Sequence, residues 1–126
     1  MKILVVDDSK AMRSLIRRTL RGARYAAALI DEAENGQQAL DAIRSNPPDL
    51  VLANFNMPEM SGIELIERVH GDGLAVDFGF ITSDDSEANV ERARRAGACF
   101  VIGKPFTRQS LRRAVNAATE GKRNSP

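Results

Sequence analysis

The chain has one cysteine, one histidine and a net charge of only +1, and each of these small numbers argues against a class of protein. A single cysteine, Cys99, excludes an internal disulfide framework. A metal or phosphohistidine role for His70 needs partners that the sequence does not show, so we expect an exposed or helix-capping histidine. The near-balanced charge gives no overall attraction to nucleic acid or membranes, and we expect neither as a partner.

Long hydrophobic runs are also absent. No apolar run approaches the roughly 20 residues that a bilayer-spanning helix needs. Residues 1–8 are too short and turn acidic too early, at Asp7, for a signal peptide. We therefore expect a cytoplasmic protein. The 126 residues suit one domain that buries about two-thirds of the surface of its unfolded chain.

Short apolar runs alternate five times with segments of helical periodicity. Ser9 and Thr107 are predicted to cap two of the helices, and Asn35-Gly36 is predicted to open another. The predicted strands cover residues 3–6, 27–33, 50–53, 78–81 and 99–102, and Asp77 and Gly79 make the fourth the weakest. Five strand–helix units with short connections predict an α/β fold, with a parallel sheet covered by helices on both faces.

Polar residues stand where the predicted strands end. Asp7 and Asp8 end the first, Asn54 the third, Thr82 the fourth and Lys104 the fifth. Because ligand chemistry in a parallel sheet belongs at the carboxyl ends of the strands, these residues are predicted to converge on one rim. Two carboxylates and a further oxygen ligand suit a hard cation such as Mg²⁺.

Together, Asp7-Asp8, the Asn54 loop with Pro58 and Gly62, Thr82 and Lys104-Pro105 resemble the receiver domain of two-component response regulators, of the single-domain chemotaxis type. The resemblance implies a flavodoxin-like (βα)5 three-layer sandwich with strand order 2-1-3-4-5. It implies a receiver domain over residues 1–120 and a flexible tail over 121–126. The implied function is phosphorelay signalling through protein contacts, without enzymatic activity.

The resemblance also implies the ligands of a magnesium ion. Asp8 would bind the ion directly and Asp7 largely through water. The side chain of Asn54 and the backbone carbonyl of Asn56 would complete the protein ligands.

Two further site roles follow from the resemblance. Thr82 would donate its hydroxyl to a phosphoryl oxygen, and Lys104 would pair with that oxygen's charge. The Lys104–Pro105 bond is expected to be cis, as is typical of the family.

Asn54 departs from the family pattern, because it stands where receivers carry the aspartate that accepts the phosphoryl group. A carboxamide is neutral and lacks the nucleophilic oxygen that in-line attack on phosphorus needs. We therefore predict that the chain is not phosphorylated as written and that it binds Mg²⁺ weakly. Two explanations stay open: a native pseudo-receiver, or an aspartate-to-asparagine change in a complete receiver.

A second departure concerns the usual aromatic switch residue three positions before the lysine, which here is Val101. The neighbouring aromatic, Phe100, would face the other side of the strand and lie in the core. Cys99 is expected to be a small buried side chain of the same strand. Met57 and Met60 are equally compatible with a partner contact and with packing of their own loop.

The predicted partners are a histidine kinase or phosphotransfer protein and a downstream protein target. A homodimer through the fourth and fifth helices is an alternative. The arginines of those helices form either a solvated face or a docking site for an acidic partner, and the arginine series of the first helix is equally open. The arginines of the two series are Arg92, Arg94, Arg95, Arg108, Arg112 and Arg113, and Arg13, Arg17, Arg18, Arg21 and Arg24.

The rival function is a small flavodoxin-like enzyme or nucleotide-binding protein. A flavin or nucleotide site would need a glycine- or hydroxyl-rich loop after the first strand, and the acidic Asp7-Asp8-Ser9-Lys10 run would repel phosphates. A phosphatase of the haloacid dehalogenase type would need two aspartates separated by one residue, whereas Asp7 and Asp8 are adjacent. Both alternatives are disfavoured.

Overall fold

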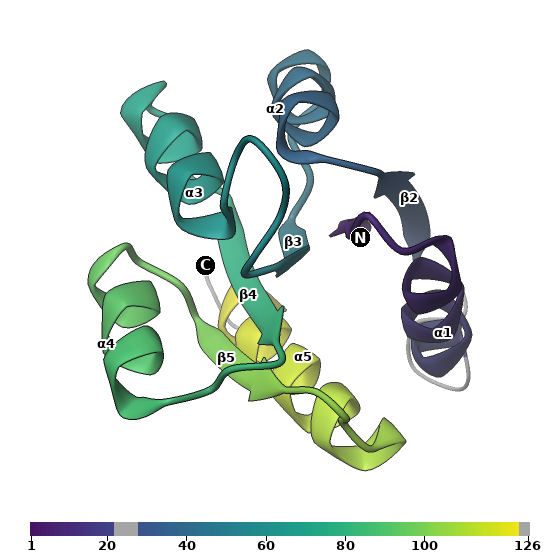
Figure 1. Ribbon diagram of the computed structural model, residues 1–126. Coiled ribbons are helices and arrows are strands. Elements are labelled where there is room, and N and C mark those ends of the chain that lie inside the picture. The colour runs from purple at the N-terminus through teal and green to yellow at the C-terminus, as the bar shows by residue number, and fades with distance from the viewer. Residues whose placement is uncertain (22–27, 124–126) are drawn as a thin grey trace.

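Strands and helices alternate along the whole chain, and the strands form one parallel sheet between two layers of helices (Figure 1). The computed structural model describes residues 1–21 and 28–123. The elements are β1 (Lys2–Val6), α1 (Lys10–Arg21), β2 (Leu29–Ala33), α2 (Gly36–Ser45), β3 (Leu50–Asn54), α3 (Gly62–Gly71), β4 (Asp77–Thr82), α4 (Glu87–Arg95), β5 (Phe100–Gly103) and α5 (Arg108–Arg123).

The strand order is β2-β1-β3-β4-β5, which confirms the predicted flavodoxin-like topology. All four strand pairs are parallel. Val6, at the end of β1, lies beside Ala33 of β2 and Ala53 of β3. Because the strands run in one direction, the residues that follow them share one edge of the sheet.

The hydrophobic core has two halves, one on each face of the sheet. Ile3 and Val5 face the half covered by α1 and α5, whereas Leu4 and Val6 face the half covered by α2 and α3. This alternation explains why β1 and β3, inside the sheet, are nearly continuous apolar runs: a strand covered on both faces needs apolar side chains at most positions. The edge strand β2 instead exposes Asp31 and Glu32.

Gly79 belongs to β4 despite the weak strand pattern around it. A Cβ at this position would collide with the ring of Phe100 on the neighbouring strand, so the glycine makes room for that ring. Phe100 packs into the core half beside α1 and α5, while Val101 packs against the other half. The prediction that the two side chains face opposite ways is confirmed.

The predicted caps Ser9 and Thr107 are present, and Asn35, at the predicted start of α2, is a cap as well. The Ser9 hydroxyl accepts a hydrogen bond from the Met12 N–H, at 3.2 Å. Asn35 Oδ1 accepts one from Gln38, at 2.8 Å, and Thr107 Oγ1 accepts one from Ser110, at 2.9 Å. Each cap satisfies a backbone donor that has no partner within its helix.

The prediction for Cys99 was wrong: this side chain is exposed, and β5 begins one residue later, at Phe100. A turn at Gly97, where φ is +102°, ends α4 and leads into the strand. The Cys99 N–H still donates to the Phe78 carbonyl, at 2.7 Å, but Phe100 takes the inward position. Phe100, and not Cys99, is therefore the first of these two side chains to pack against the core.

Other boundaries shift slightly. The second strand begins at Leu29, and Ala27, the predicted start, lies outside the described residues. The last helix includes residues 121–123, which the sequence analysis assigned to the tail. Met57 and Met60 are buried in the core half below α2 and α3, which favours a packing role over a partner contact.

No helix in the described ranges, 1–21 and 28–123, is long and apolar enough to cross a membrane.

Candidate functional site

The predicted site residues meet at the carboxyl edge of the sheet. Asp7 directly follows β1, Asn54 is the last residue of β3, and Thr82 is the last residue of β4. Lys104 directly follows β5. Since β3 lies between β1 and β4, Asn54 sits between the strands that carry Asp7 and Thr82. The topology thus brings together residues up to 97 positions apart.

Asp7 is the most constrained of these side chains and is only 2% exposed. Its Oδ1 accepts a hydrogen bond from the Ser9 N–H, at 2.8 Å. Its Oδ2 lies 3.2 Å from the Lys104 Nζ. Both carboxylate oxygens therefore have partners inside the protein. Asp8, by contrast, is exposed on the rim.

Arg13 is a site residue that the sequence analysis missed. It was grouped with the surface arginines, but it is 7% exposed and its terminal nitrogen Nη1 donates to the Asp7 backbone carbonyl, at 2.6 Å. Its Nε pairs with Glu32 on β2, at 2.9 Å. The available signal was its spacing: Arg13 precedes the buried Ile16 and Leu20 at helical intervals, and so shares their stripe.

The loop after Asn54 is held on both sides. The Phe55 N–H donates to Ile81 on β4, at 3.2 Å, and its carbonyl accepts from Gly62, at 2.9 Å. A Cβ at Gly62 would lie 2.9 Å from the Asn54 carbonyl oxygen, so glycine permits this close approach. The guanidinium of Arg92 on α4 lies 5.7 Å from the centre of the Phe55 ring.

Thr82 is fully buried, and its hydroxyl accepts a hydrogen bond from the Asp84 N–H, at 3.0 Å. The hydroxyl is thus used in the turn between β4 and α4. The Thr82 carbonyl accepts from the Lys104 N–H, at 2.6 Å, which places the start of the Lys104 loop beside β4. The Lys104–Pro105 peptide is cis, as expected.

The donor set fits a hard cation only in part. Asp8 offers an exposed carboxylate, Asn54 a half-buried amide oxygen and Asn56 a backbone carbonyl, while Asp7 is engaged by Lys104. Oxygen donors of these kinds are those that Mg²⁺ prefers. Within the described part of the chain, no cluster of three or more His, Cys, Asp or Glu side chains could hold a metal ion. Any magnesium site would therefore have few charged ligands.

His70, the single histidine, lies away from the rim near the end of α3. It is exposed, as predicted, and its Nε2 lies 3.0 Å from the Val76 carbonyl oxygen. Its ring also meets the edge of Phe78, with ring centres 6.0 Å apart.

Residues 3–116 match the family described as the response regulator receiver domain. Among curated proteins, the chain is 40% identical over 115 residues to chemotaxis protein CheY1 of Helicobacter pylori, which covers 89% of this chain and 91% of that protein. It is 41% identical over 115 residues to a CheY homologue of Campylobacter jejuni, covering 89% and 87%.

Solved structures agree with this match. The signal receiver domain of NarL from Mycobacterium tuberculosis superposes with a TM-score of 0.86 at 28% identity, covering 95% of this chain and 96% of that one. Chemotaxis protein CheY4 of Vibrio cholerae gives 0.83 at 25% identity, covering 93% and 97%. Fold, rim and sequence similarity lead to one conclusion: the chain belongs to the response regulator receiver domain family.

Proposed function

We propose that this receiver works in a two-component phosphorelay by protein contact and that, as written, Asn54 prevents it from accepting a phosphoryl group. One observation carries the proposal. Asn54 ends the central strand β3, between the strand ends that carry Asp7 and Thr82, where a nucleophile would be reached by Lys104 and a metal ion. The family match favours this function over the flavin, nucleotide and phosphatase alternatives.

The chemistry follows from the amide group of Asn54. An aspartate at this point could attack phosphorus with a carboxylate oxygen and form an acyl phosphate. In asparagine the amide nitrogen delocalises its lone pair into the carbonyl and the group carries no net charge, so its oxygen is a much poorer nucleophile than a carboxylate oxygen. Asp8, Thr82 and Lys104 are still at the rim and would supply the metal ligand, the hydroxyl and the cation to an aspartate at position 54.

A magnesium ion would be held weakly, by Asp8 directly, by Asp7 through water, and by Asn54 and the Asn56 carbonyl. When bound, such an ion offsets negative charge on a transferring phosphoryl group. The chain's own contribution is to position Asp7 through Ser9, Arg13 and Lys104.

The proposed partners are a histidine kinase or phosphotransfer protein and a downstream protein target. Dimerisation through α4 and α5 is a further proposal. The proposed domain spans residues 1–120. Membership of a receiver family supports the partners, since receivers are signalling modules rather than enzymes.

Incubation with acetyl phosphate and Mg²⁺, followed by intact-mass measurement, tests the proposal. We expect no phosphoryl adduct on the chain as written and a base-labile adduct on its Asn54→Asp variant. An adduct of normal yield on the unaltered chain would refute the block at Asn54. A folded but inert Asn54→Asp variant would show that the site lacks more than one carboxylate oxygen.

A further inference from the structure

The sequence analysis treated the arginines of the fourth and fifth helices as one set, but their contacts in the structure differ. On α4, Arg94 and Arg95 both pair with Glu91, and Arg92 lies over the Phe55 ring. The arginines of α4 therefore already have partners within the protein. The suspected basic docking surface on α4 is largely neutralised by its own helix.

Helices α1 and α5 differ from α4 in charge. The side chains of α1 include five lysines and arginines and no carboxylate. Two of them, Arg13 and Arg17, pair with Glu32 of β2, which leaves Lys10, Arg18 and Arg21 without an ion pair among the described residues. The described side chains of α5 include three arginines and one carboxylate, Glu120. Because net charge is only +1, the compensating acids lie elsewhere on the molecule, which gives it a basic side.

The two helices lie side by side on one face of the sheet (Figure 1). Arg112 joins them, since its Nε donates to the Thr19 carbonyl near the end of α1, at 3.0 Å. This bond uses one of the five N–H groups of the guanidinium and fixes it between the helices. Arg112 also lines an open hollow of about 390 Å³ with Arg108, Gln109, Arg113 and Asn116.

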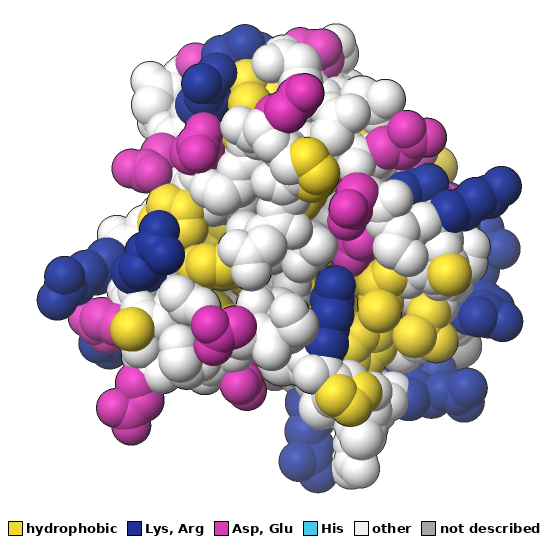
Figure 2. Space-filling view, in the orientation of Figure 1, with side chains coloured by type: hydrophobic (Ala, Val, Ile, Leu, Met, Phe, Trp, Pro, Cys, Tyr) yellow, Lys and Arg dark blue, Asp and Glu magenta, His cyan; other side chains and the backbone are white. Residues whose placement is uncertain are grey.

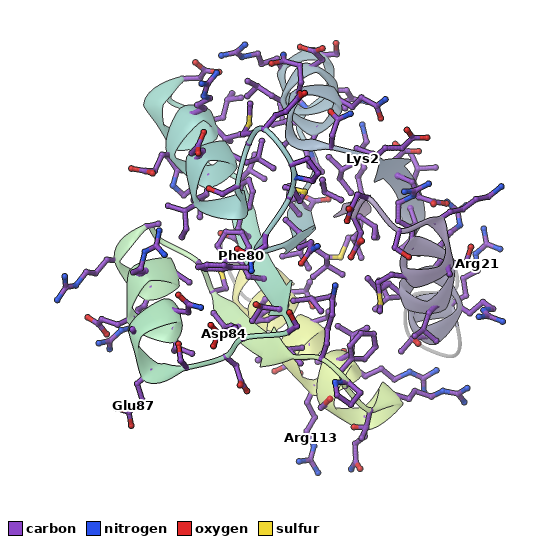
Figure 3. The ribbon with its side chains drawn as sticks, in the orientation of Figure 1. Lys2, Arg21, Phe80, Asp84, Glu87 and Arg113 are labelled. Carbon is purple, nitrogen blue, oxygen red and sulfur yellow. The ribbon has the colours of Figure 1, made fainter. Side chains whose placement is uncertain are left out.

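We call the exposed side of these two helices the basic face; its arginines are Arg18, Arg21, Arg108, Arg112 and Arg113. None of the five has an ion-pair partner among the side chains described in residues 1–21 and 28–120, and Arg112 donates to the Thr19 backbone carbonyl. In Figure 3 the labelled Arg21 and Arg113 project outward from α1 and α5. These guanidinium groups are thus available to an external anion.

An exposed leucine, Leu15, lies within the basic face. Leu15 is 41% exposed and precedes Thr19 by one helical turn, so it is on the side of α1 that contacts Arg112. Figure 2 shows apolar side chains on this side of the molecule with Lys and Arg around them. An apolar centre with a charged rim is the composition of a protein-binding surface.

We propose that the basic face binds an acidic segment of a partner protein, with a hydrophobic side chain against Leu15 and carboxylates against Arg18, Arg112 and Arg113. A second copy of the chain is disfavoured here because cations would face cations. A nucleic acid is disfavoured because the sequence pI is about 7.9, below the values above 9 typical of such domains. The inference gives a chemistry to the protein partner of the proposed function and does not depend on phosphorylation at position 54.

The test is a titration of the isotope-labelled chain with a peptide of glutamates and regularly spaced leucines, followed by amide NMR. We expect shift changes centred on residues 15–21 and 108–116. Changes centred on α4, or no binding, would overturn the proposal. Because no phosphodonor is present, this outcome is separate from the phosphorylation test.

Two charge-reversal variants add a matched comparison. R18E/R113E should weaken binding of this peptide about tenfold or more, because like charges then meet. R94E/R95E makes the same change in net charge on α4 and should weaken it far less. Equal losses would mean that only net charge matters and would overturn the proposal. Tighter binding of polyuridylate than of the peptide would replace the protein partner with a nucleic acid.

Discussion

At the scale of single residues, the rim has two carboxylates of very different availability. Asp7 is buried and has Ser9 and Lys104 on its two oxygens, whereas Asp8 is exposed. A metal ion at this rim must compete with the Lys104 ammonium for Asp7. It also gains nothing from a charge at Asn54. Both effects lower affinity, because charged oxygens offset the dehydration of the ion.

We therefore expect Mg²⁺ to bind weakly and to bind more tightly after Asn54→Asp, as measured by calorimetric or NMR titration. Asp8→Ala should abolish the remaining binding. Thr82→Ala is the matched control and should leave affinity unchanged, because the Thr82 hydroxyl is bonded to Asp84 within the β4–α4 turn. Equal affinity with Asn54 and Asp at this position would mean that residue 54 is not a ligand.

At the scale of elements, one exposed ion pair fastens α2 to α3. Arg44, in the last turn of α2, donates to both carboxylate oxygens of Asp72, at 2.7 and 3.3 Å. Asp72 is the C-cap residue of α3. The hydrogen bond from Arg44 lowers the pKa of Asp72 below its ordinary value, and Asp72 in turn raises the pKa of Arg44.

The sign of the pH effect follows from the lowered pKa of Asp72. The pair stabilises the fold above the ordinary pKa of an aspartate, and this contribution is lost as pH falls through the lowered value. In Arg44→Gln, an NMR titration should show the pKa of Asp72 moving up toward its ordinary value. Arg94→Gln removes the same charge from α4 and should leave the pKa of Asp72 at its lowered value. An unchanged pKa in Arg44→Gln would mean that the pair does not form in solution.

At the scale of the whole molecule, the Asp7–Lys104 pair connects the ends of the first and last strands, 97 residues apart. Without the ammonium, the Ser9 backbone N–H is the one hydrogen-bond partner that the Asp7 carboxylate keeps among the described residues. An uncompensated buried charge is costly. The pair therefore contributes to the stability of the entire sheet as well as to the site.

Lys104→Met should accordingly lower the free energy of unfolding by about 2 kcal/mol, somewhat less than for a fully buried pair because Lys104 is partly exposed. Urea unfolding at neutral pH provides the measurement. Arg94→Met, which breaks an exposed pair on α4, is the control and should change the free energy of unfolding by less than about 1 kcal/mol. A Lys104→Met variant as stable as the parent would show that another group compensates the buried charge of Asp7.

Local sequence patterns were enough to determine the five strand–helix units, the helix caps Ser9 and Thr107, and the residues of the rim. Apolar periodicity and capping chemistry act over a few residues, so they can be read without the fold. The rule for parallel sheets then placed Asp7, Asn54, Thr82 and Lys104 at one edge.

Only the tertiary structure decided which groups those residues contact. The burial of Arg13 under Asp7, the exposure of Cys99, the space left by Gly79 for Phe100 and the joining of α1 to α5 by Arg112 all depend on neighbouring elements. Most of these features depend on which elements pack together, and a pattern that repeats every few residues does not specify the partner element. The sequence therefore specified the types of side chain at the site, and the packing of the elements determined their partners.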